Sequence, residues 1–300
     1  QAMKERTAHG VDFNSAIRKK TNEPTHMTAQ TRLVKPARET RLPDSRFNGA
    51  HVNGGCLAAD GLRWQPFQRR NTQGARALPK MVENFARDVA PADMHGRLDA
   101  PAFHRNKDPL VATLKSLLES CEGDIIEIGS GTGQHAVTFA AALEGLTFWP
   151  SDPLPEHIAS IEAWRAFSDL PNVKPATQLD CLQPVWRIDS HELASESLTG
   201  VIAINVIHIA PRPVAEAIFA GAGKYLNSDG LLIFYGPFKK DGQHNSGGNV
   251  DFDRALRTRN PEFGIRDIAE LTDYAASNGL RLSDEIGMPA NNRTLVFQRC

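Results

Sequence analysis

The chain has 300 residues, of which 41 % are hydrophobic and 23 % charged, with a net charge of −1. This composition is close to the average of soluble globular proteins and excludes a collagen, a coiled coil and a wholly disordered chain. The apolar runs are too short for a transmembrane helix, which needs ~20 consecutive apolar residues. The N-terminal charges are not followed by the apolar h-region of a secretory signal peptide. We therefore expect no membrane association.

The cysteines show no sign of a disulfide framework or a metal site. Cys56, Cys121, Cys181 and Cys300 are scattered, without a CxxC pair or the spacing of zinc ligands. Unpaired cysteines are typical of a reducing compartment. We therefore expect a cytoplasmic protein that binds no metal.

Basic residues are concentrated near the N-terminus. Residues 1–80 hold 15 Lys and Arg against 6 Asp and Glu, whereas residues 81–300 hold 19 against 29, so the net charges are +9 and −10. Residues 1–80 show no sustained period, and we expect a mostly disordered basic tail ahead of one domain over residues 81–300. Three other interpretations stay open: an organelle transit peptide, a basic arm for nucleic acid, and an upstream extension with translation starting at Met81 or Met94.

From residue 101 the pattern predicts alternating helices and strands. Apolar residues at helical spacing predict a helix over residues 108–118, with Pro109 in its first turn. Further helices are expected over residues 134–143, 155–167, 213–225 and 265–277, and strands over 125–128, 146–149, 173–179, 201–206, 231–235, 281–286 and 294–298. Strands separated by helices predict an α/β fold with a mainly parallel sheet. No helix separates the last two strands, which favours an antiparallel hairpin at the C-terminus. Seven strands with a terminal hairpin are the layout of the common methyltransferase fold.

A glycine-rich turn follows the first predicted strand. Residues 124–135 read DIIEIGSGTGQH, so Glu127 precedes Gly129, Gly131 and Gly133, and a helix follows. Glycines let the backbone turn sharply and approach a ligand, and the N–H groups at a helix start favour an anionic group. The dinucleotide fingerprint GxGxxG fails because Gln134 stands at its last position. An acid two residues before the first glycine is typical of S-adenosyl-L-methionine sites, and we expect that cofactor on these four residues.

Two acids end the next two predicted strands. Asp152 stands 19 residues after Gly133, at a strand end where the ligand crevice lies, and can accept hydrogen bonds from two ribose hydroxyls. The alternative is an N-cap for the helix that follows. Asp180 follows the third strand, where this fold meets the adenine amino group, and capping of its own loop is the alternative.

Two polar residues interrupt the apolar run at residues 201–209. Asn205 and His208 stand near its end, which lies beside the transferable methyl group in this fold. A polar residue in a buried run needs a partner, so each is either a satisfied core residue or a site residue. We count Asn205 as a cofactor-binding and catalytic candidate and His208 as a catalytic candidate.

Six motifs together resemble the methyltransferase-like protein 26 family. They are RNKDP at residues 105–109, EIGSGTGQH at 127–135, WPSDP at 149–153, INVIHIAP at 204–211, YGPF at 235–238 and MPANN at 288–292. The resemblance runs from about residue 96 to the C-terminus. It implies a Rossmann-like class I methyltransferase fold that depends on S-adenosylmethionine, and it implies no substrate.

We therefore expect methyl transfer to a small molecule, with His208 as the base for a hydroxyl acceptor. A histidine follows the same strand in plant phenolic O-methyltransferases, but an acid comes directly after it there, whereas this chain has Ile209. The alternative function is a non-catalytic module that binds S-adenosylmethionine and acts through interaction or regulation.

Residues outside the cofactor half are expected to build the substrate pocket. The candidates are Arg105, Asn106, Lys107, Tyr235, Phe238, His244, Asn291 and its neighbour Asn292. Cations and amides suit a small polar or anionic substrate, and the glycine-rich segment 235–249 could form a mobile lid. The net charge of −10 over residues 81–300 argues against a nucleic-acid partner.

Overall fold

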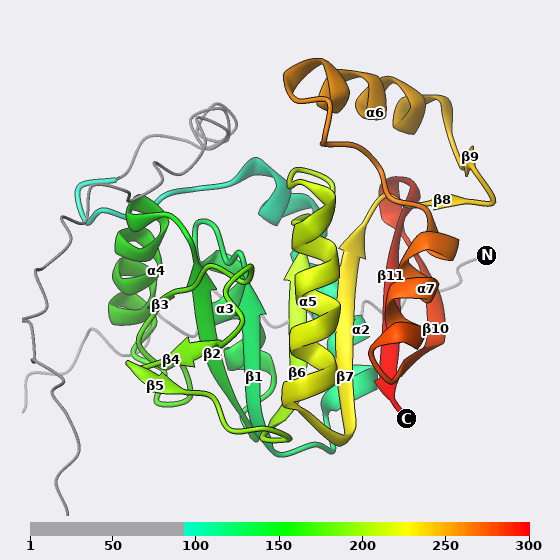
Figure 1. Cartoon of the computed structure of the whole chain (residues 1–300). Coiled ribbons are helices and arrows are strands. Elements are labelled where there is room, and N and C mark those ends of the chain that lie inside the picture. Colours follow the sequence, from blue (N-terminus) through cyan, green and yellow to red (C-terminus); the bar gives the residue numbers. More distant parts are fainter. Residues whose placement is uncertain (1–92) are drawn as a thin grey trace, which may run out of the picture. The chain divides into compact units, whose positions relative to one another are not determined.

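The computed structural model describes residues 93–300, so the predicted tail, the boundary at residue 80 and Cys56 lie outside the described residues. Within them a seven-stranded sheet has the order β10-β11-β7-β6-β1-β2-β3 (Figure 1). The strands are β1 (Gly123–Ile128), β2 (Leu146–Asp152), β3 (Thr177–Gln178), β6 (Leu198–Ile204), β7 (Leu226–Gly236), β10 (Leu280–Met288) and β11 (Asn292–Arg299). The first five run parallel, while β11 pairs antiparallel with both β7 and β10. The predicted α/β fold with a C-terminal hairpin is confirmed.

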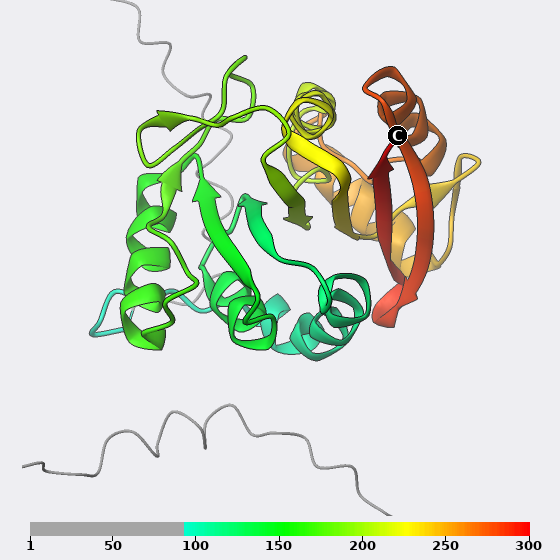
Figure 2. The same ribbon diagram turned by 90° about the horizontal axis from the view of Figure 1, so that it is seen from below.

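Helices cover both faces of this sheet. α2 (Pro101–Leu118), α3 (Gln134–Ala142) and α4 (Pro155–Ser168) lie on one side, and α5 (Arg212–Tyr225) and α7 (Ile268–Ser277) on the other (Figure 2). All seven residues of β6 are buried, as expected for a central strand that is covered twice. None of the helices within residues 93–300 is long and apolar enough to cross a membrane.

Each face of the sheet has its own core, because neighbouring residues of a strand point to opposite faces. On β1, Ile125 packs with the core that contains Leu114 of α2, and Ile126 packs with the core that contains Phe219 of α5. The carboxyl ends of the parallel strands meet at one edge, where parallel α/β sheets bind their ligands. A short hairpin of β8 (Lys239–Lys240) and β9 (Gln243–His244) and the helix α6 (Gly247–Arg259) follow β7 beyond this edge (Figure 1).

The first helix differs from its prediction. α2 begins at Pro101 instead of residue 108, so Pro109 lies inside it and not in its first turn. Proline has no N–H, and the carbonyl of Arg105 therefore loses its helical donor. The added turns are held by burial, because Phe103 and Asn106 are 9 % and 5 % exposed. The hydrophobic period from residue 110 onward could not reveal these turns.

Three other elements also depart from the expected boundaries. β6 ends at Ile204 because Asn205 takes a φ of +58° that a strand does not allow. The third predicted strand is reduced to β3 and a single bridge between Val173 and Phe148. The segment 235–249, which the sequence predicts as a mobile lid, holds the end of β7, the strands β8 and β9 and the start of α6.

The pattern did not reveal α6, because this helix starts with two glycines and contains few apolar residues. The Ser246 hydroxyl caps it by accepting a hydrogen bond from the N–H of Asn249 at 3.2 Å. Two more short strands, β4 (Arg187–Ile188) and β5 (His191–Glu192), pair in the connection between β3 and β6.

Close packing of α5 gives a test of the fold. A Cβ at Gly221 would overlap the buried ring of Trp186. Gly221→Ala should therefore lower the free energy of unfolding by ~1–3 kcal/mol, although alanine favours helices. Gly248→Ala in α6 is the control, since its nearest neighbour would be 3.9 Å away, and should leave stability unchanged or raise it by up to ~1 kcal/mol. Urea denaturation measures both, and an equal effect of the two variants would contradict this packing.

Candidate functional site

The glycine turn connects the end of β1 to α3 in the middle of the sheet edge. Gly129, Gly131 and Gly133 all have positive φ angles, of +68°, +56° and +89°. A Cβ at Gly129 would lie 2.8 Å from Val206, and one at Gly133 would lie 2.7 Å from the backbone of Ile161. A Cβ at Gly131 would meet nothing within 4 Å. Two glycines therefore serve close packing, and the middle one faces open space where a ligand can approach.

Glu127 carries a buried carboxyl group at the base of this turn. Its side chain is 2 % exposed, and its Oε2 has no hydrogen-bond partner among the described residues. Burial raises the pKa of Glu127 to about 7, with Asp152 adding to the effect and Ser130 opposing it. An unpaired buried carboxylate is costly, so a cationic or N–H group of a ligand would be stabilised here.

The Asp152 carboxylate ties the turn to the start of α4. Its Oδ2 accepts a hydrogen bond from the N–H of Gly131 at 2.9 Å, and its Oδ1 accepts one from the N–H of Leu154 at 3.0 Å. The N-cap residue of α4 is Leu154, so Asp152 stabilises the bend before the helix and is not its N-cap. A carboxylate has about four acceptor positions, and with His157 also in contact about one is left for a hydroxyl group of a ligand.

His157 belongs to the same cluster, and sequence reasoning missed it. Its Nδ1 lies 3.0 Å from Oδ1 of Asp152, and its side chain is 13 % exposed. Burial opposes the charged imidazole, but Asp152 and Glu156 outweigh this and raise the pKa of His157. The available signal was its position in the first turn of the helix that follows Asp152.

Asp180 adopts a loop-capping role in the structure. Its Oδ1 accepts from the N–H of Leu182, and its Oδ2 accepts from Nε2 of Gln183, both at 3.0 Å. It also lines a hollow of about 380 Å³ with Gln178, Leu179, Gln183, Pro184, Val185 and Arg187. A flat group bound in this hollow would therefore lie beside the Asp180 carboxylate.

Gln134 brings the start of α2 to the glycine turn. Its Oε1 accepts a hydrogen bond from the N–H of Ala100 at 2.8 Å, and its Nε2 donates to Asp99 at 2.7 Å. Ser160 of α4 accepts from the N–H of Leu98 at 2.9 Å. These bonds place the first turns of α2, with Arg105 and Asn106, at the ligand edge of the sheet. Sequence reasoning used Gln134 only to exclude a dinucleotide fingerprint.

His208 is enclosed in the turn after β6. Its side chain is 1 % exposed, and neither ring nitrogen has a hydrogen-bond partner within residues 93–300. The ring packs edge-on against Phe238 with centroids 5.1 Å apart, and a Cβ at Gly236 would overlap its Nε2. Burial lowers the pKa of His208 to about 3, Arg266 adds to this effect, and Asp253 opposes it. The imidazole is therefore neutral at pH 7.

The backbone on both sides of His208 is held by one buried arginine and its neighbours. Arg266 donates from Nε to the carbonyl of Ile207 at 3.0 Å and from Nη2 to that of Ala210 at 2.6 Å. The N–H of Gly264 donates to the carbonyl of His208 at 2.9 Å. The segment after α6 thus fixes the turn that carries Asn205 and His208. Sequence analysis did not single out Arg266.

The structure divides the substrate candidates between the two faces of β7. Tyr235 belongs to the core on the α2 side, where its hydroxyl accepts a hydrogen bond from Nδ2 of Asn292 at 3.0 Å. Asn106 lies there too, with its Oδ1 2.9 Å from Nε2 of His135. Phe238 belongs to the opposite core, with His208. Asn106, Tyr235 and Asn292 therefore come together, and Phe238 does not join them.

Three further candidates have other contacts. The Lys107 ammonium lies over the ring of Phe103 at 5.8 Å. Nε2 of His244 lies 3.3 Å from Asp253 of α6. Asn291 uses its carbonyl oxygen, which accepts from Asn245 at 2.9 Å and from Asn249 at 3.2 Å. None of these three contacts, within the described residues, joins the group around Tyr235.

A family model described as "Protein of unknown function (DUF938)" matches residues 97–299. The chain belongs to this family. All the candidate residues, from Arg105 to Asn292, lie within the matched DUF938 region.

Solved methyltransferase structures share the fold of this DUF938 domain. An O-methyltransferase family protein from Burkholderia thailandensis matches with a TM-score of 0.54 and 16 % identity, over 66 % of this chain and 57 % of its own. A second match is NcsB1, an O-methyltransferase from neocarzinostatin biosynthesis that was solved with S-adenosylmethionine and 2-hydroxy-5-methyl naphthoic acid. It matches with a TM-score of 0.51 and 17 % identity, over 66 % of this chain and 55 % of its own. The chain thus spans little more than half the length of these proteins. Its fold is the Rossmann-like methyltransferase fold.

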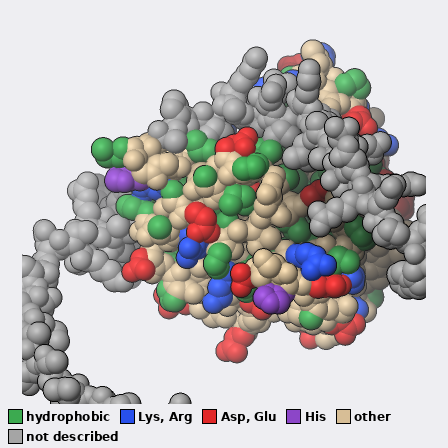
Figure 3. All heavy atoms as spheres, turned by 60° about the vertical axis from the view of Figure 1, so that its left-hand side comes forward, with side chains coloured by type: hydrophobic (Ala, Val, Ile, Leu, Met, Phe, Trp, Pro, Cys, Tyr) green, Lys and Arg blue, Asp and Glu red, His purple; other side chains and the backbone are tan. Residues whose placement is uncertain are grey.

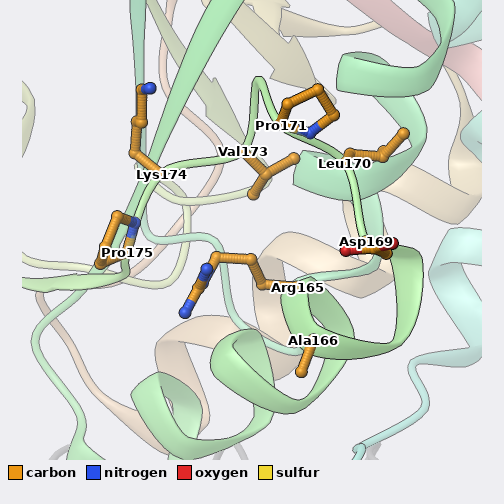
Figure 4. A pocket seen from close by; sticks show the side chains of 8 residues that line it. All are labelled: Arg165, Ala166, Asp169, Leu170, Pro171, Val173, Lys174 and Pro175. Carbon is orange, nitrogen blue, oxygen red and sulfur yellow. The ribbon is translucent and has the colours of Figure 1, made fainter. Parts of the chain in front are cut away.

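Another hollow, of about 390 Å³, lies away from these residues. It surrounds the C-terminal end of α4, and Figure 4 shows its lining side chains, which include Arg165, Leu170, Val173 and Lys174. The glycine turn and Asp152 lie at the other end of α4. No candidate residue lines this hollow, and Arg165 is paired with Glu162 at 2.6 Å.

The raised pKa of Glu127 predicts a pH dependence of stability. The folded carboxyl group has a pKa of about 7 against an ordinary 4.5, so the folded protein binds this proton more tightly than the unfolded chain does. The resulting stabilisation is complete below the unfolded value and is lost as the pH rises through the folded value. At ~1.4 kcal/mol per unit it amounts to about 3 kcal/mol.

Glu127→Gln should remove this dependence. The unfolding free energy of the variant minus that of the unchanged protein should rise by up to ~3 kcal/mol between about pH 4.5 and pH 8. Urea denaturation at a series of pH values measures both unfolding free energies. Groups that titrate alike in the two proteins cancel when one free energy is subtracted from the other. A difference that stays flat over this range would show that the Glu127 carboxyl titrates normally.

Proposed function

We propose that this protein is an S-adenosyl-L-methionine-dependent methyltransferase that methylates an oxygen of a small polar or anionic molecule. The observation that carries the proposal is the open space over Gly131, whose N–H is bonded to the Asp152 carboxylate, together with the buried Glu127 Oε2, which has no partner within residues 93–300. The shared fold and the ordered motifs support it. The relation to the methyltransferase-like protein 26 family stays a prediction.

The residues at the sheet edge fit this cofactor. Glu127 offers an acceptor to an ammonium group, and the exposed backbone at Gly131 allows close approach. Asp152 keeps about one acceptor position for a ribose hydroxyl, and Asp180 borders the hollow of about 380 Å³ that would take the adenine base. Asn205, with its left-handed backbone, would complete the site at the end of β6.

The cofactor, when bound, supplies an electrophilic methyl group on a sulfonium sulfur. The chain must hold the acceptor oxygen ~3–3.5 Å from that methyl group and exclude water. His208 would take the hydroxyl proton at one of its unbonded ring nitrogens. Its enclosed position requires the cover formed by α6 and residues 260–267 to open before the acceptor enters.

A small-molecule acceptor agrees with the charge of the domain. Lys and Arg are interspersed with Asp and Glu on the described part of the face in Figure 3, and no basic stripe is visible there. Nucleic-acid binding relies on such a stripe, so we do not expect it.

One observation favours a second candidate function, a non-catalytic module that binds the cofactor. His208 is 1 % exposed, its pKa is lowered to about 3, and Ile209 replaces the acid that follows the base in plant enzymes. A base held in this way is weak unless the turn rearranges.

Two measurements on the full-length protein separate these functions. Calorimetric titration with S-adenosylhomocysteine should show binding, and the absence of binding at millimolar ligand would reject both functions. Transfer of labelled methyl groups from S-adenosylmethionine to a metabolite extract should then occur if the protein is an enzyme. Binding without transfer across broad extracts would support the non-catalytic module.

Asp152→Ala should weaken S-adenosylhomocysteine binding by roughly 10- to 150-fold, because hydrogen bonds to a charged group contribute ~1.5–3 kcal/mol. Glu156→Ala is the matched control, since it removes the same charge from an exposed neighbouring position. Calorimetry measures both affinities, and the melting temperature checks that each variant folds. Equal affinities of the two variants would show that Asp152 contributes nothing to cofactor binding.

His208→Leu should raise the free energy of unfolding by ~1–3 kcal/mol and abolish methyl transfer, because it removes two unpaired buried nitrogens. Cofactor affinity should stay nearly unchanged. If His208→Leu instead destabilises the protein and His208→Asn keeps near-full transfer, the histidine is a packing residue and not the base.

A further inference from the structure

The Asp152 carboxylate has room for one hydroxyl group of a ribose. Its Oδ1 accepts from the N–H of Leu154 and lies 3.0 Å from Nδ1 of His157, and its Oδ2 accepts from the N–H of Gly131. These three contacts leave about one acceptor position, on Oδ2. The cofactor of the proposed function carries two neighbouring ribose hydroxyl groups, so the second one needs another partner beside Asp152.

The bend before α4 places His157 at this point. Leu154 is the N-cap residue of the helix, and Pro155 is its first residue, where the fixed φ of proline suits a helix start. The hydrogen bond from the N–H of Leu154 to Asp152 holds the bend. His157 therefore lies in the first turn of α4, with its ring in contact with the Asp152 carboxylate.

One nitrogen of the His157 ring is enclosed, and the other is available to a ligand. Nδ1 is buried beside Asp152, and the side chain as a whole is 13 % exposed. No hydrogen bond or ion pair within residues 93–300 involves Nε2. One carbon atom separates Nε2 from Nδ1 and Oδ2 from Oδ1, so both available atoms lie beside the same 3.0 Å contact.

An imidazole nitrogen bonds a hydroxyl group in either protonation state. A nitrogen without hydrogen accepts, a nitrogen with hydrogen donates, and a hydroxyl group can serve as the partner of both. A hydrogen bond between Nε2 of His157 and a ribose hydroxyl therefore does not require a particular charge on the ring.

We propose that Asp152 and His157 divide the ribose of the cofactor between them: Oδ2 of Asp152 accepts from one hydroxyl group, and Nε2 of His157 bonds the other. This inference rests on the proposed methyltransferase function and assigns to His157 a part in selecting a ribonucleoside over its deoxy forms. A site that bonds a hydroxyl group discriminates against a ligand without it, because the polar groups of the site are then left unpaired.

The test compares S-adenosylhomocysteine with its two forms that lack the 2′- or the 3′-hydroxyl group, by calorimetry on the full-length protein. Loss of the hydroxyl that Asp152 binds should weaken binding by roughly 10-fold or more, since the acceptor is charged. Loss of the hydroxyl that His157 binds should weaken it by roughly 3- to 10-fold. Equal binding of all three ligands would overturn the proposal without any variant.

Variants then assign each hydroxyl group to its residue. His157→Phe should weaken S-adenosylhomocysteine by roughly 3- to 10-fold and should no longer distinguish it from one of the deoxy forms. Asp152→Ala should lose the discrimination against the other deoxy form. His157→Gln keeps a group that bonds a hydroxyl and should keep both discriminations, which tests the role of the position even if His157→Phe does not fold.

His104→Phe is the matched control. His104 of α2 also pairs with an aspartate, since its Nε2 lies 2.7 Å from Oδ1 of Asp99, but its side chain is 56 % exposed. This variant should leave all three affinities within about 2-fold. The melting temperature of each variant checks that it folds.

Two results with the variants contradict the proposal. If His157→Phe keeps both discriminations, His157 supports the bend and does not touch the ribose. If His157→Phe and Asp152→Ala lose the discrimination against the same deoxy form, the two residues meet one hydroxyl group and do not divide the ribose.

Adenosine separates this proposal from the methyltransferase function, because it carries the same ribose without the amino-acid part. If adenosine binds with these discriminations and S-adenosylhomocysteine does not bind, the ribose site stands and the methyltransferase function fails. If S-adenosylhomocysteine binds without them, the methyltransferase function stands and the assignment of His157 is wrong. If neither ligand binds, both proposals fail.

Discussion

The carboxylate of Asp152 joins the glycine turn after β1 to the bend before α4, and the ligand edge of the sheet depends on this link. It accepts hydrogen bonds from Gly131 and Leu154 and contacts His157. With the turn fixed, Gln134 at the start of α3 holds Asp99 and Ala100. The start of α2 is consequently held beside α3. One acid therefore organises the predicted cofactor site.

Two buried ionisable groups at this edge have polar atoms without a hydrogen-bond partner among the described residues. Glu127 keeps a carboxyl oxygen unbonded, and His208 keeps both ring nitrogens unbonded. Each costs stability that an apolar residue of the same size would not. Such costs persist where a ligand or a reaction uses the group, and the two residues lie on the neighbouring central strands β1 and β6 or in the turns that follow them.

The region after β7 holds the turn that carries His208. Arg266 and Gly264 hold the backbone of residues 205–211 from the segment that follows α6. Asp253 of α6 accepts a hydrogen bond from the N–H of Ile265 at 2.7 Å, which connects the helix to this segment. A movement of α6 would therefore loosen the turn that carries Asn205 and His208. Within the described residues His208 and Phe238 lie on one side of β7, and Tyr235 lies on the other.

The sequence alone determined the alternation of strands and helices, the parallel sheet with its terminal hairpin, and the glycine turn between Glu127 and α3. These features depend on local spacing: apolar periods, glycine positions and turn residues are readable within a few residues. Only the tertiary structure decided that α2 begins at Pro101, that α6 forms, and that His208 is enclosed. It also decided that Asn292 donates a hydrogen bond to Tyr235, although 57 residues separate the two. Burial and hydrogen-bond satisfaction depend on which distant segments pack together, and that information is absent from any short stretch of sequence.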